Sequence, residues 1–312
     1  MKYKITIIIL LTLGLVCMSL VSCKQNQTKI GMLIASPVFK PDLTYFSSLI
    51  SKEKYSVISA DANYDDKLQI AQAAALINQG VKILVIVAVN TNTAAAIVRL
   101  ANERNIKTLA YERIISNCKL DYFISFDNVM VGELLAKEAL RLKPTGNYYV
   151  MDGDKSDRNA VWVHDGFFKA LEAPIKSGQV NMVYDTYIED WAADNALFEF
   201  ERYVRLSGIV PDVILSAYNG MNTGLFAYFA KKNISPVPIV AGQDMDTKEN
   251  RALTDVSQRI RLYKSSKLEA EAAADLALKI LKNQKINIDQ KINNGLVDVN
   301  TIIIKEMKIE SN

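Results

Sequence analysis

The sequence predicts an α/β protein made of two Rossmann-like, doubly wound lobes, each built around a parallel sheet. Short β-branched runs alternate with longer helical patterns, and the alternation continues through most of the 312 residues in two successive series. Alternating strands and helices form βαβ units, which assemble into parallel sheets. Removing the first 22 residues leaves 312 − 22 = 290, a length that suits two domains better than one.

The first series predicts strands and helices in regular succession. The strands are expected at residues 29–34, 55–59, 82–87 and 107–110, and the helices at 42–52, 65–79 and 91–104. In the second of these helices, Leu68, Ala71 and Ala75 recur at helical spacing, and the following Gly80 supplies a stop. The strand at 82–87 is continuously apolar, which is typical of a strand covered on both faces.

The second series starts at residue 122 and is longer. Its strands are expected at residues 122–125, 147–151, 180–186, 213–216, 238–241, 257–262 and 301–304, and its helices at 129–142, 159–171, 194–203, 219–232, 248–253 and 265–282. No stretch rich in proline, glycine or serine separates the two series. The connection between the lobes is therefore expected to be compact.

Residues 1–22 predict an export signal. A short basic start precedes an apolar run of 16 residues at 5–20. A membrane-spanning helix needs roughly 20 such residues, so the run is short for a span. The sequence LVSC at 20–23 resembles the lipobox of bacterial lipoproteins, which implies that Cys23 is lipidated and tethers the protein to a membrane. The alternative is an ordinary signal peptide with an incidental cysteine.

Composition narrows the class of protein. Of the three cysteines, Cys17 lies in the expected signal and Cys23 is the expected anchor, so Cys118 has no partner for an internal disulfide. Without the two lysines of the signal, the basic residues number 37 − 2 = 35, and the net charge is 35 − 34 = +1. Such a chain has no basic field for nucleic acid, and we expect no nucleic-acid partner.

Polar and aromatic side chains follow many of the predicted strands. The carboxyl ends of parallel strands meet at one edge of a sheet, where ligands of open α/β sheets bind. The side chains of this kind are Glu112, Arg113, Asp127, Asn128, Trp191, Asn195, Asn219, Asp244 and Lys264. Carboxylates, amides and cations can hydrogen-bond sugar hydroxyls, and the Trp191 ring can cover the apolar face of a sugar. Helix capping is the alternative role for Asp127 and Asn219.

Catalytic patterns are weak in this sequence. His164 is the only histidine, and the chain has no G-x-S-x-G motif, no G-x-G-x-x-G motif and no paired-cysteine metal pattern. Glu112 and Asp244 could form the carboxylate pair of a secreted glycoside hydrolase, which remains an alternative. We expect a binding protein that is not an enzyme and that needs no cofactor or metal.

Nine blocks of the chain resemble the type I periplasmic sugar-binding proteins of ABC transporters, and in particular the D-xylose-binding proteins. The blocks are INQGVKILVIVAVN (77–90), KTLAYERII (107–115), DYFISFDNVMVGELLAK (121–137), GNYYVMDG (146–153), SDRNA (156–160), EDWAADNAL (189–197), AGQD (241–244), LYK (262–264) and NNGLVDV (293–299). The resemblance implies two lobes that are joined by a three-segment hinge and close on a sugar. The sugar ligands that it implies are Arg113, Asp127, Asn128, Asn159, Trp191, Asn195, Asn219, Asp244 and Lys264.

The chain departs from the family pattern at the expected site. Glu112 stands where the family has aspartate, which moves the carboxylate by roughly an angstrom. Gly220 replaces a carboxylate, and Val161 replaces a lysine. The first loop, residues 35–39, lacks the family's arginine and leaves Ser36 and Phe39 as candidate contacts. These changes bear on which sugar is bound.

With the resemblance, the first lobe is expected to contain residues 29–126 and 243–283, and the second lobe residues 127–242 and 284–312. The expected protein is a monomeric lipoprotein of the cell envelope or periplasm that captures a monosaccharide, with a xylose-like pentose favoured. Its expected partner is a membrane ABC permease. The alternatives are a sensor that reports the sugar to a membrane receptor kinase and, from another class, the secreted hydrolase.

Overall fold

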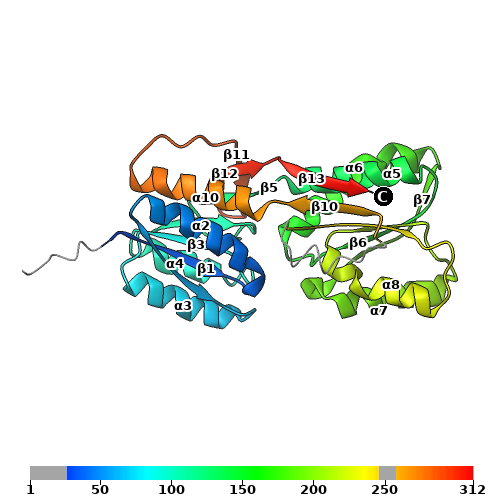
Figure 1. Ribbon diagram of the computed structural model, residues 1–312, viewed down its shortest axis with the longest axis horizontal. Helices are drawn as coiled ribbons and strands as arrows, with labels where there is room; N and C mark the ends of the chain where they lie inside the picture. Colours follow the sequence, from blue (N-terminus) through cyan, green and yellow to red (C-terminus); the bar gives the residue numbers. More distant parts are fainter. Residues whose placement is uncertain (1–26, 246–257, 312) are drawn as a thin grey trace, which may run out of the picture.

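The computed structural model describes residues 27–245 and 258–311. Two α/β lobes follow one another along the long axis of the molecule (Figure 1). The expected signal at 1–22, the expected anchor Cys23 and the expected helix at 248–253 lie outside the described residues. Among the helices of 27–245 and 258–311, none combines the length and apolar character that crossing a membrane requires.

The first lobe is built on a sheet with the strand order β11-β12-β5-β4-β3-β1-β2. The strands are β1 (Lys29–Ile34), β2 (Ser56–Asp61), β3 (Ile83–Ile86), β4 (Lys107–Tyr111), β5 (Tyr122–Phe126), β11 (Gln290–Asn293) and β12 (Asp298–Ile304). Neighbouring strands run parallel, and only β11 pairs antiparallel with its neighbour β12 among the described pairings of this sheet. The doubly wound lobe predicted from the sequence is therefore confirmed.

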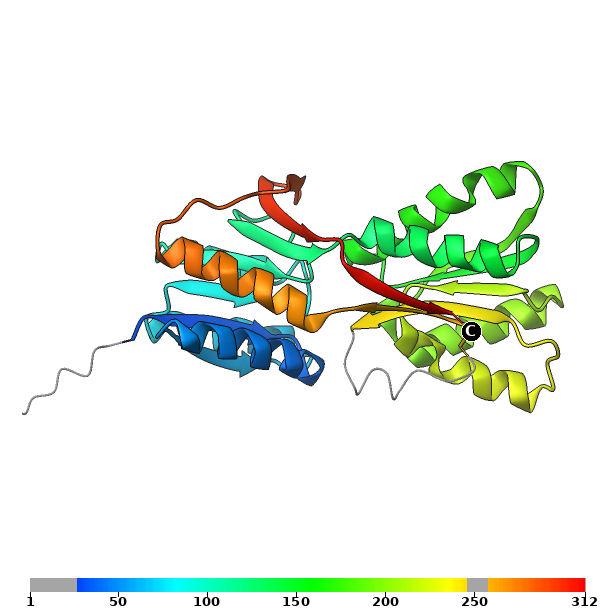
Figure 2. The ribbon, with the colours of Figure 1, turned by 45° about the horizontal axis from the view of Figure 1, so that its top comes forward.

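Helices cover both faces of this sheet, as Figures 1 and 2 show. They are α2 (Lys40–Lys52), α3 (Asp66–Asn78), α4 (Ala95–Asn102) and α10 (Ser266–Leu281). Met32 of β1 is buried with residues of α2 and α10, whereas its neighbour Leu33 is buried with residues of α3 and α4. Successive strand residues point to opposite faces, so the apolar runs of these strands fill two cores at once.

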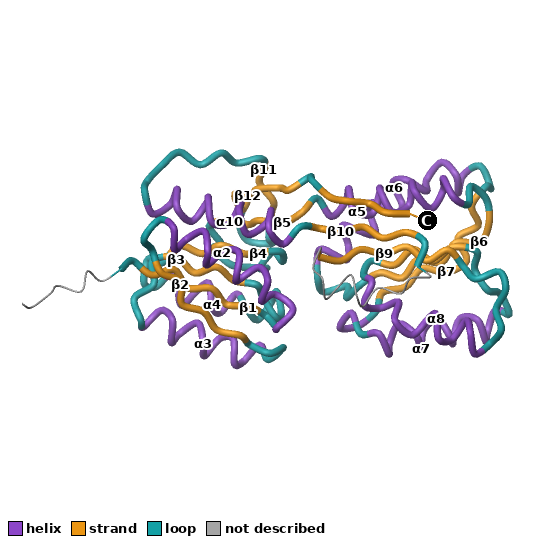
Figure 3. Tube along the Cα trace, viewed as in Figure 1, coloured by secondary structure: helices purple, strands orange, loops and turns teal. Residues whose placement is uncertain are grey.

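The second lobe repeats the architecture with the strand order β13-β10-β9-β8-β6-β7. Its strands are β6 (Gly146–Asp152), β7 (Val180–Tyr187), β8 (Val213–Ser216), β9 (Ile239–Met245), β10 (Ile260–Lys264) and β13 (Met307–Ser311). Its helices are α5 (Asn128–Leu142), α6 (Arg158–Lys176), α7 (Ala193–Ser207) and α8 (Thr223–Lys231). Helices α5 and α6 lie over one face, and α7 and α8 over the other (Figures 1 and 3).

Three segments of the described chain pass between the lobes, which Figure 2 shows most clearly. The first joins β5 to α5, the second joins β10 to α10, and the third joins β12 to β13. The carboxyl ends of the parallel strands in both sheets point toward these three segments. The strand ends of the two lobes therefore meet in the region between the lobes.

The expected lobe boundaries are wrong for β10, β11 and β12, whereas α10 lies in the first lobe and β13 in the second as expected. Residues 243–283 were expected in the first lobe, yet β10 pairs in parallel with β9 of the second sheet. Residues 284–312 were expected in the second lobe, yet β12 pairs in parallel with β5 of the first sheet. Apolar periodicity reveals a strand but does not reveal to which sheet edge the strand adds its backbone hydrogen bonds.

Candidate functional site

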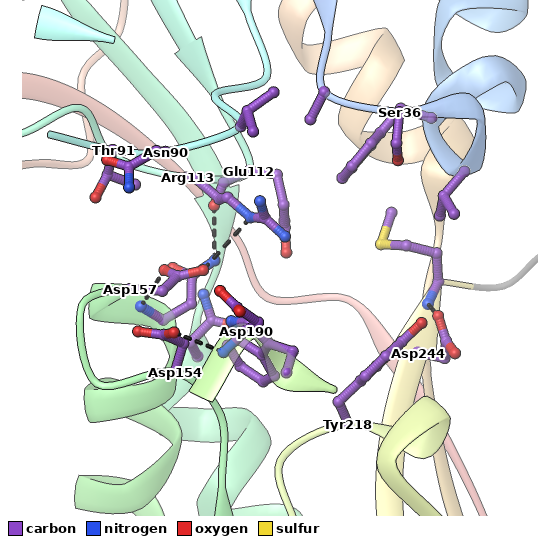
Figure 4. A pocket seen from close by; sticks show the side chains of 18 of the residues that line it. Ser36, Asn90, Thr91, Glu112, Arg113, Asp154, Asp157, Asp190, Tyr218 and Asp244 are labelled. Carbon is purple, nitrogen blue, oxygen red and sulfur yellow. Dashed lines mark hydrogen bonds and ion pairs between the residues drawn. The ribbon is translucent and has the colours of Figure 1, made fainter. Parts of the chain in front are cut away.

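A cavity of about 660 Å³ lies between the two lobes. The first lobe contributes the lining residues Ala35, Ser36, Val38, Phe39, Tyr64, Val89, Asn90, Thr91, Glu112 and Arg113. The second lobe and the crossings contribute Asn128, Asp154, Ser156, Asp157, Asn159, Val163, Asp190, Trp191, Tyr218, Gln243, Asp244, Met245 and Lys264. Figure 4 shows how the labelled polar side chains of both lobes face this space.

Seven of the ten site residues predicted from the sequence line this cavity: Glu112, Arg113, Asn128, Asn159, Trp191, Asp244 and Lys264. Ser36 and Phe39, the candidate contacts of the first loop, line it too. These residues come from strand ends and helix starts that are far apart in the sequence. The parallel sheets bring them together because the carboxyl ends of parallel strands share one edge.

Three predicted residues do not line the cavity. Asp127 caps α5, since its Oδ1 accepts a hydrogen bond from the Met130 amide at 3.0 Å. The Asn195 side chain donates to the Glu189 carbonyl at 3.1 Å. Asn219 is buried, and its Oδ1 accepts from Nε2 of Gln258 at 2.7 Å. Hydrogen bonds within the protein therefore hold all three side chains. The capping alternative is confirmed for Asp127 but not for Asn219, which lies inside a short 3-10 helix and pairs with the distant Gln258.

Glu112 connects the two lobes. It follows β4 with left-handed backbone geometry (φ +62°), a conformation that costs a non-glycine residue about 1–2 kcal/mol. Its Oε1 lies 2.5 Å from Nζ of Lys264 at the end of β10, and both side chains are almost fully buried. Its carbonyl accepts a hydrogen bond from Nδ2 of Asn159 on α6 at 2.8 Å. Glu112 thus contacts the second lobe through both its side chain and its backbone.

Arg113 makes a second connection between the lobes. Its Nη1 donates to the Ala88 carbonyl at 3.2 Å, and its Nε lies 3.4 Å from Oδ2 of Asp157 (Figure 4). Asp157 caps α6, because its Oδ1 accepts from the Asn159 amide at 2.9 Å. Burial raises the pKa of Asp157 in spite of the nearby Arg113. The guanidinium is therefore fixed by both lobes at the edge of the cavity.

An aromatic wall closes another side of the cavity. The rings of Trp191 and Tyr218 meet edge to face, with centroids 6.2 Å apart. Gly153 permits this position of Trp191, since a Cβ there would lie 2.1 Å from the indole ring. Gly220 does the same for Tyr218, with a Cβ at 2.3 Å from the phenol ring. The Tyr218 ring thus fills the space that a carboxylate side chain at position 220 would need.

Asp244 is the buried carboxylate on the opposite side of the cavity from Asp154 (Figure 4). It lies near the end of β9, and its Oδ1 accepts from the Met245 amide at 2.7 Å. Burial raises the pKa of Asp244 to about 7, although Lys264 opposes this effect. Asp244 can therefore act as a hydrogen-bond acceptor when ionised and as a donor when protonated.

Two unsatisfied acceptors also lie among the lining residues. Oδ1 of Asn159 and Oε1 of Gln243 are buried and have no hydrogen-bond partner within residues 27–245 and 258–311. The other end of the Gln243 amide donates to the Ala217 carbonyl at 2.9 Å, which fixes its orientation. Buried polar atoms are normally paired, so these two oxygens favour a ligand that brings hydroxyl donors.

A group of buried acids lies next to Glu112 in the first lobe. Oδ1 of Asp42 accepts a hydrogen bond from the Tyr111 hydroxyl at 2.7 Å, and burial raises the pKa of Asp42 to about 7. Burial raises the pKa of Glu269 as well, and the charge of Glu112 adds to this effect. Because Lys264 is paired with Glu112, the remaining acids are favoured in their neutral form at mildly acidic pH.

The sequence prediction missed Asp154 and Asp157. Oδ2 of Asp154 accepts a hydrogen bond from the Asp190 amide at 2.7 Å, which ties the loop after β6 to the segment that carries Trp191. Both Asp154 and Asp157 follow the strand predicted at 147–151, so the strand-end rule could have found them. Carboxylates outnumber cations in the lining, which suits a neutral polyhydroxy ligand better than an anion.

Residues 36–285 match the family model described as periplasmic binding protein domain. The chain is 30% identical over 292 residues to the D-xylose-binding periplasmic protein of Haemophilus influenzae, covering 93% of this chain and 88% of that protein. It is also 30% identical over 311 residues to the D-xylose-binding periplasmic protein of Escherichia coli, covering 97% and 93%. The chain therefore belongs to the type I periplasmic sugar-binding protein family, and the D-xylose-binding proteins are among its relatives.

Solved structures agree on the fold. An ABC transporter solute-binding protein from Clostridium phytofermentans, solved with bound β-D-glucose, superposes with a TM-score of 0.81 at 22% identity. The match covers 91% of this chain and 94% of that chain. The two-lobed architecture of parallel sheets is thus shared over nearly the whole length.

Proposed function

We propose that this protein captures a monosaccharide, with a xylose-like pentose favoured, in the interlobe cavity. The observation that carries the proposal is a cavity that combines carboxylates, a guanidinium and an ammonium with an aromatic wall, contributed by both lobes. Paired hydrogen bonds to hydroxyls and an aromatic partner for the C–H face of a ring are the two requirements of sugar recognition. The 30% identity to D-xylose-binding proteins supports the choice of pentose.

The proposal extends to the cellular role. Residues 1–22 would direct export, and lipidated Cys23 would hold the protein in the cell envelope, beside an ABC permease that receives the sugar. The matched family and relatives support a binding protein over the hydrolase, and the ion pair of Glu112 with Lys264 already engages one carboxylate of the hydrolase alternative. In this proposal the protein is a monomer and binds the sugar without a cofactor.

The test is a thermal-shift screen of the lipid-free protein from Lys24 onward against pentoses, hexoses and deoxy sugars. A ligand at one hundred times its Kd should add about 2.7 kcal/mol of stability, which raises Tm by several degrees. We expect the largest shift with xylose or a close stereoisomer. A flat response to every monosaccharide would contradict the proposal.

Matched amide variants locate the site in the same experiment. Asn159→Ala removes an amide that lines the cavity, whereas Asn195→Ala removes one that lies outside it. We expect Asn159→Ala to weaken sugar binding by roughly 5- to 150-fold, since truncating a buried hydrogen-bonding group costs about 1–3 kcal/mol. Asn195→Ala should leave the affinity unchanged, and equal effects of the two variants would contradict this site.

A further inference from the structure

Three metal-ligating side chains converge in the second lobe, outside the interlobe cavity. Asp152 is the last residue of β6, His164 lies on α6 and Asp185 lies on β7. One possible ligand atom from each lies within 4.8 Å of the other two. Nε2 of His164 is 3.2 Å from Oδ2 of Asp185 and 3.9 Å from Oδ2 of Asp152. None of the three lines the cavity.

Asp152 is the unusual member of this cluster. Its side chain is 0% exposed, and no N–H or hydroxyl donor of the described residues reaches either of its oxygens. Burial, together with the neighbouring Asp185 carboxyl, raises the pKa of Asp152 to about 9. Buried carboxylates are normally paired with a cation or hydrogen-bonded, because burial removes the water that stabilises the charge. The two flanking ligands, an imidazole and a second carboxylate, do not supply a fixed positive charge.

The donor set points to a class of ion. One imidazole and two carboxylates suit borderline divalent metals such as zinc, whereas calcium and magnesium prefer six or more oxygen ligands. Zinc with bonds of about 2.0–2.2 Å and tetrahedral angles places its ligand atoms about 3.3–3.6 Å apart. The separations of 3.2 and 3.9 Å from Nε2 of His164 are near this range, and the two carboxylates lie within 4.8 Å of each other.

The neighbouring residues restrain the His164 ring and leave the site accessible to an ion from solvent. The His164 ring packs against Phe168 at 4.5 Å and Tyr187 at 5.6 Å between centroids, which restrains its orientation. The side chains of His164 and Asp185 are 22% and 38% exposed, so an ion can reach them from solvent. When the ligand side chains are already held in place and coordination positions are open, a metal ion can bind without a large rearrangement.

We propose that Asp152, His164 and Asp185 form a binding site for one divalent transition-metal ion of the zinc class. The ion would neutralise the buried carboxylate and join β6, α6 and β7 at one point. The loop of Asp154 and the segment of Trp191 leave from these strands, and the Ile188 amide donates to the Asp152 carbonyl at 3.1 Å. A bound ion would therefore restrain the segments that carry Asp154 and Trp191.

The test uses the lipid-free protein from Lys24 onward, freed of any affinity tag and treated with EDTA. We expect calorimetric titration with zinc chloride to give one ion per chain and zinc to raise Tm, with no response to magnesium. His164→Gln and Asp185→Asn should each weaken zinc binding at least tenfold. Because His164 is the only histidine of the chain, the first variant removes every imidazole.

Control variants separate this site from other binding. Glu172→Gln changes an exposed carboxylate of the same helix, and Cys118→Ser removes the buried thiol. Both should bind zinc like the unchanged protein. Cobalt(II) provides an independent readout, since its visible absorption should change on binding and this change should disappear in His164→Gln.

Asp152→Asn keeps the experiment decisive if other variants fold poorly. It removes the ionisable group but keeps the shape of the side chain, and it should abolish the response to zinc. Absence of stoichiometric zinc binding would overturn the proposal, and so would zinc binding that His164→Gln leaves unchanged. No sugar is present in these measurements, so their outcome is separate from the test of sugar capture.

Discussion

Among single residues, the buried pair of Glu112 and Lys264 has the clearest energetic role. The two charges are 2.5 Å apart and come from different lobes. Removing one partner leaves the other buried and unpaired, so we expect Glu112→Gln and Lys264→Met each to cost about 3–5 kcal/mol of stability in urea unfolding. The double variant should cost clearly less than the sum of the two. Additive losses would show that the charges do not stabilise one another.

Asp42 predicts a pH dependence of stability. Burial raises the pKa of Asp42 to about 7 from a usual value of 3.8, so between these values the folded protein holds a proton that the unfolded chain has lost. The stabilising contribution of this proton is complete below pH 3.8 and is lost as the pH rises through 7.

Asp42→Asn should therefore stabilise the protein more at pH 8 than at pH 5, because the amide never ionises and its oxygen can still accept from Tyr111. The difference between the two pH values should be on the order of 2–3 kcal/mol, since one pKa unit corresponds to about 1.4 kcal/mol. Urea unfolding of both proteins at both pH values measures it. A stability difference that does not change with pH would contradict a raised pKa for this group.

At the scale of elements, the loop after β6 positions the aromatic wall through Gly153. Gly153→Ala would place a Cβ 2.1 Å from the indole of Trp191 and displace the ring. We expect the variant to weaken sugar binding at least tenfold in a thermal-shift titration. Gly178→Ala is a matched control, since its Cβ meets nothing within 4 Å and only its φ of +76° is strained. It should lower stability slightly and leave sugar affinity unchanged.

At the scale of the whole molecule, the crossings make the first lobe depend on the C-terminal part of the chain. Helix α10 buries Ala270, Ala273 and Leu276 against the first sheet, and β12 adds to that sheet beside β5. A chain that ends at residue 264 lacks both elements and should fail to fold. Circular dichroism and thermal unfolding check this expectation, and a cooperative transition in the shortened chain would contradict it.

The amino-acid sequence alone determined the class of fold and much of the site. Apolar runs at 82–87 and helical spacing at 65–79 follow from local geometry, and the strand-end rule found Arg113, Trp191 and Asp244. The resemblance of the chain to a sugar-binding family rested on blocks of the same sequence, and the family match confirms it.

Only the tertiary structure decided which sheet receives β10 and β12, and which polar side chains face the cavity. Sheet membership depends on hydrogen bonds between distant strands, which no local pattern records. Asn219 and Asn195 resemble ligand residues in the sequence, but Asn219 pairs with the distant Gln258 and Asn195 donates to the nearby Glu189 carbonyl, which only the three-dimensional structure reveals. Asp152, His164 and Asp185 are separated along the chain, and the pairing of β6 with β7 under α6 brings them together because adjacent strands lie about 4.8 Å apart.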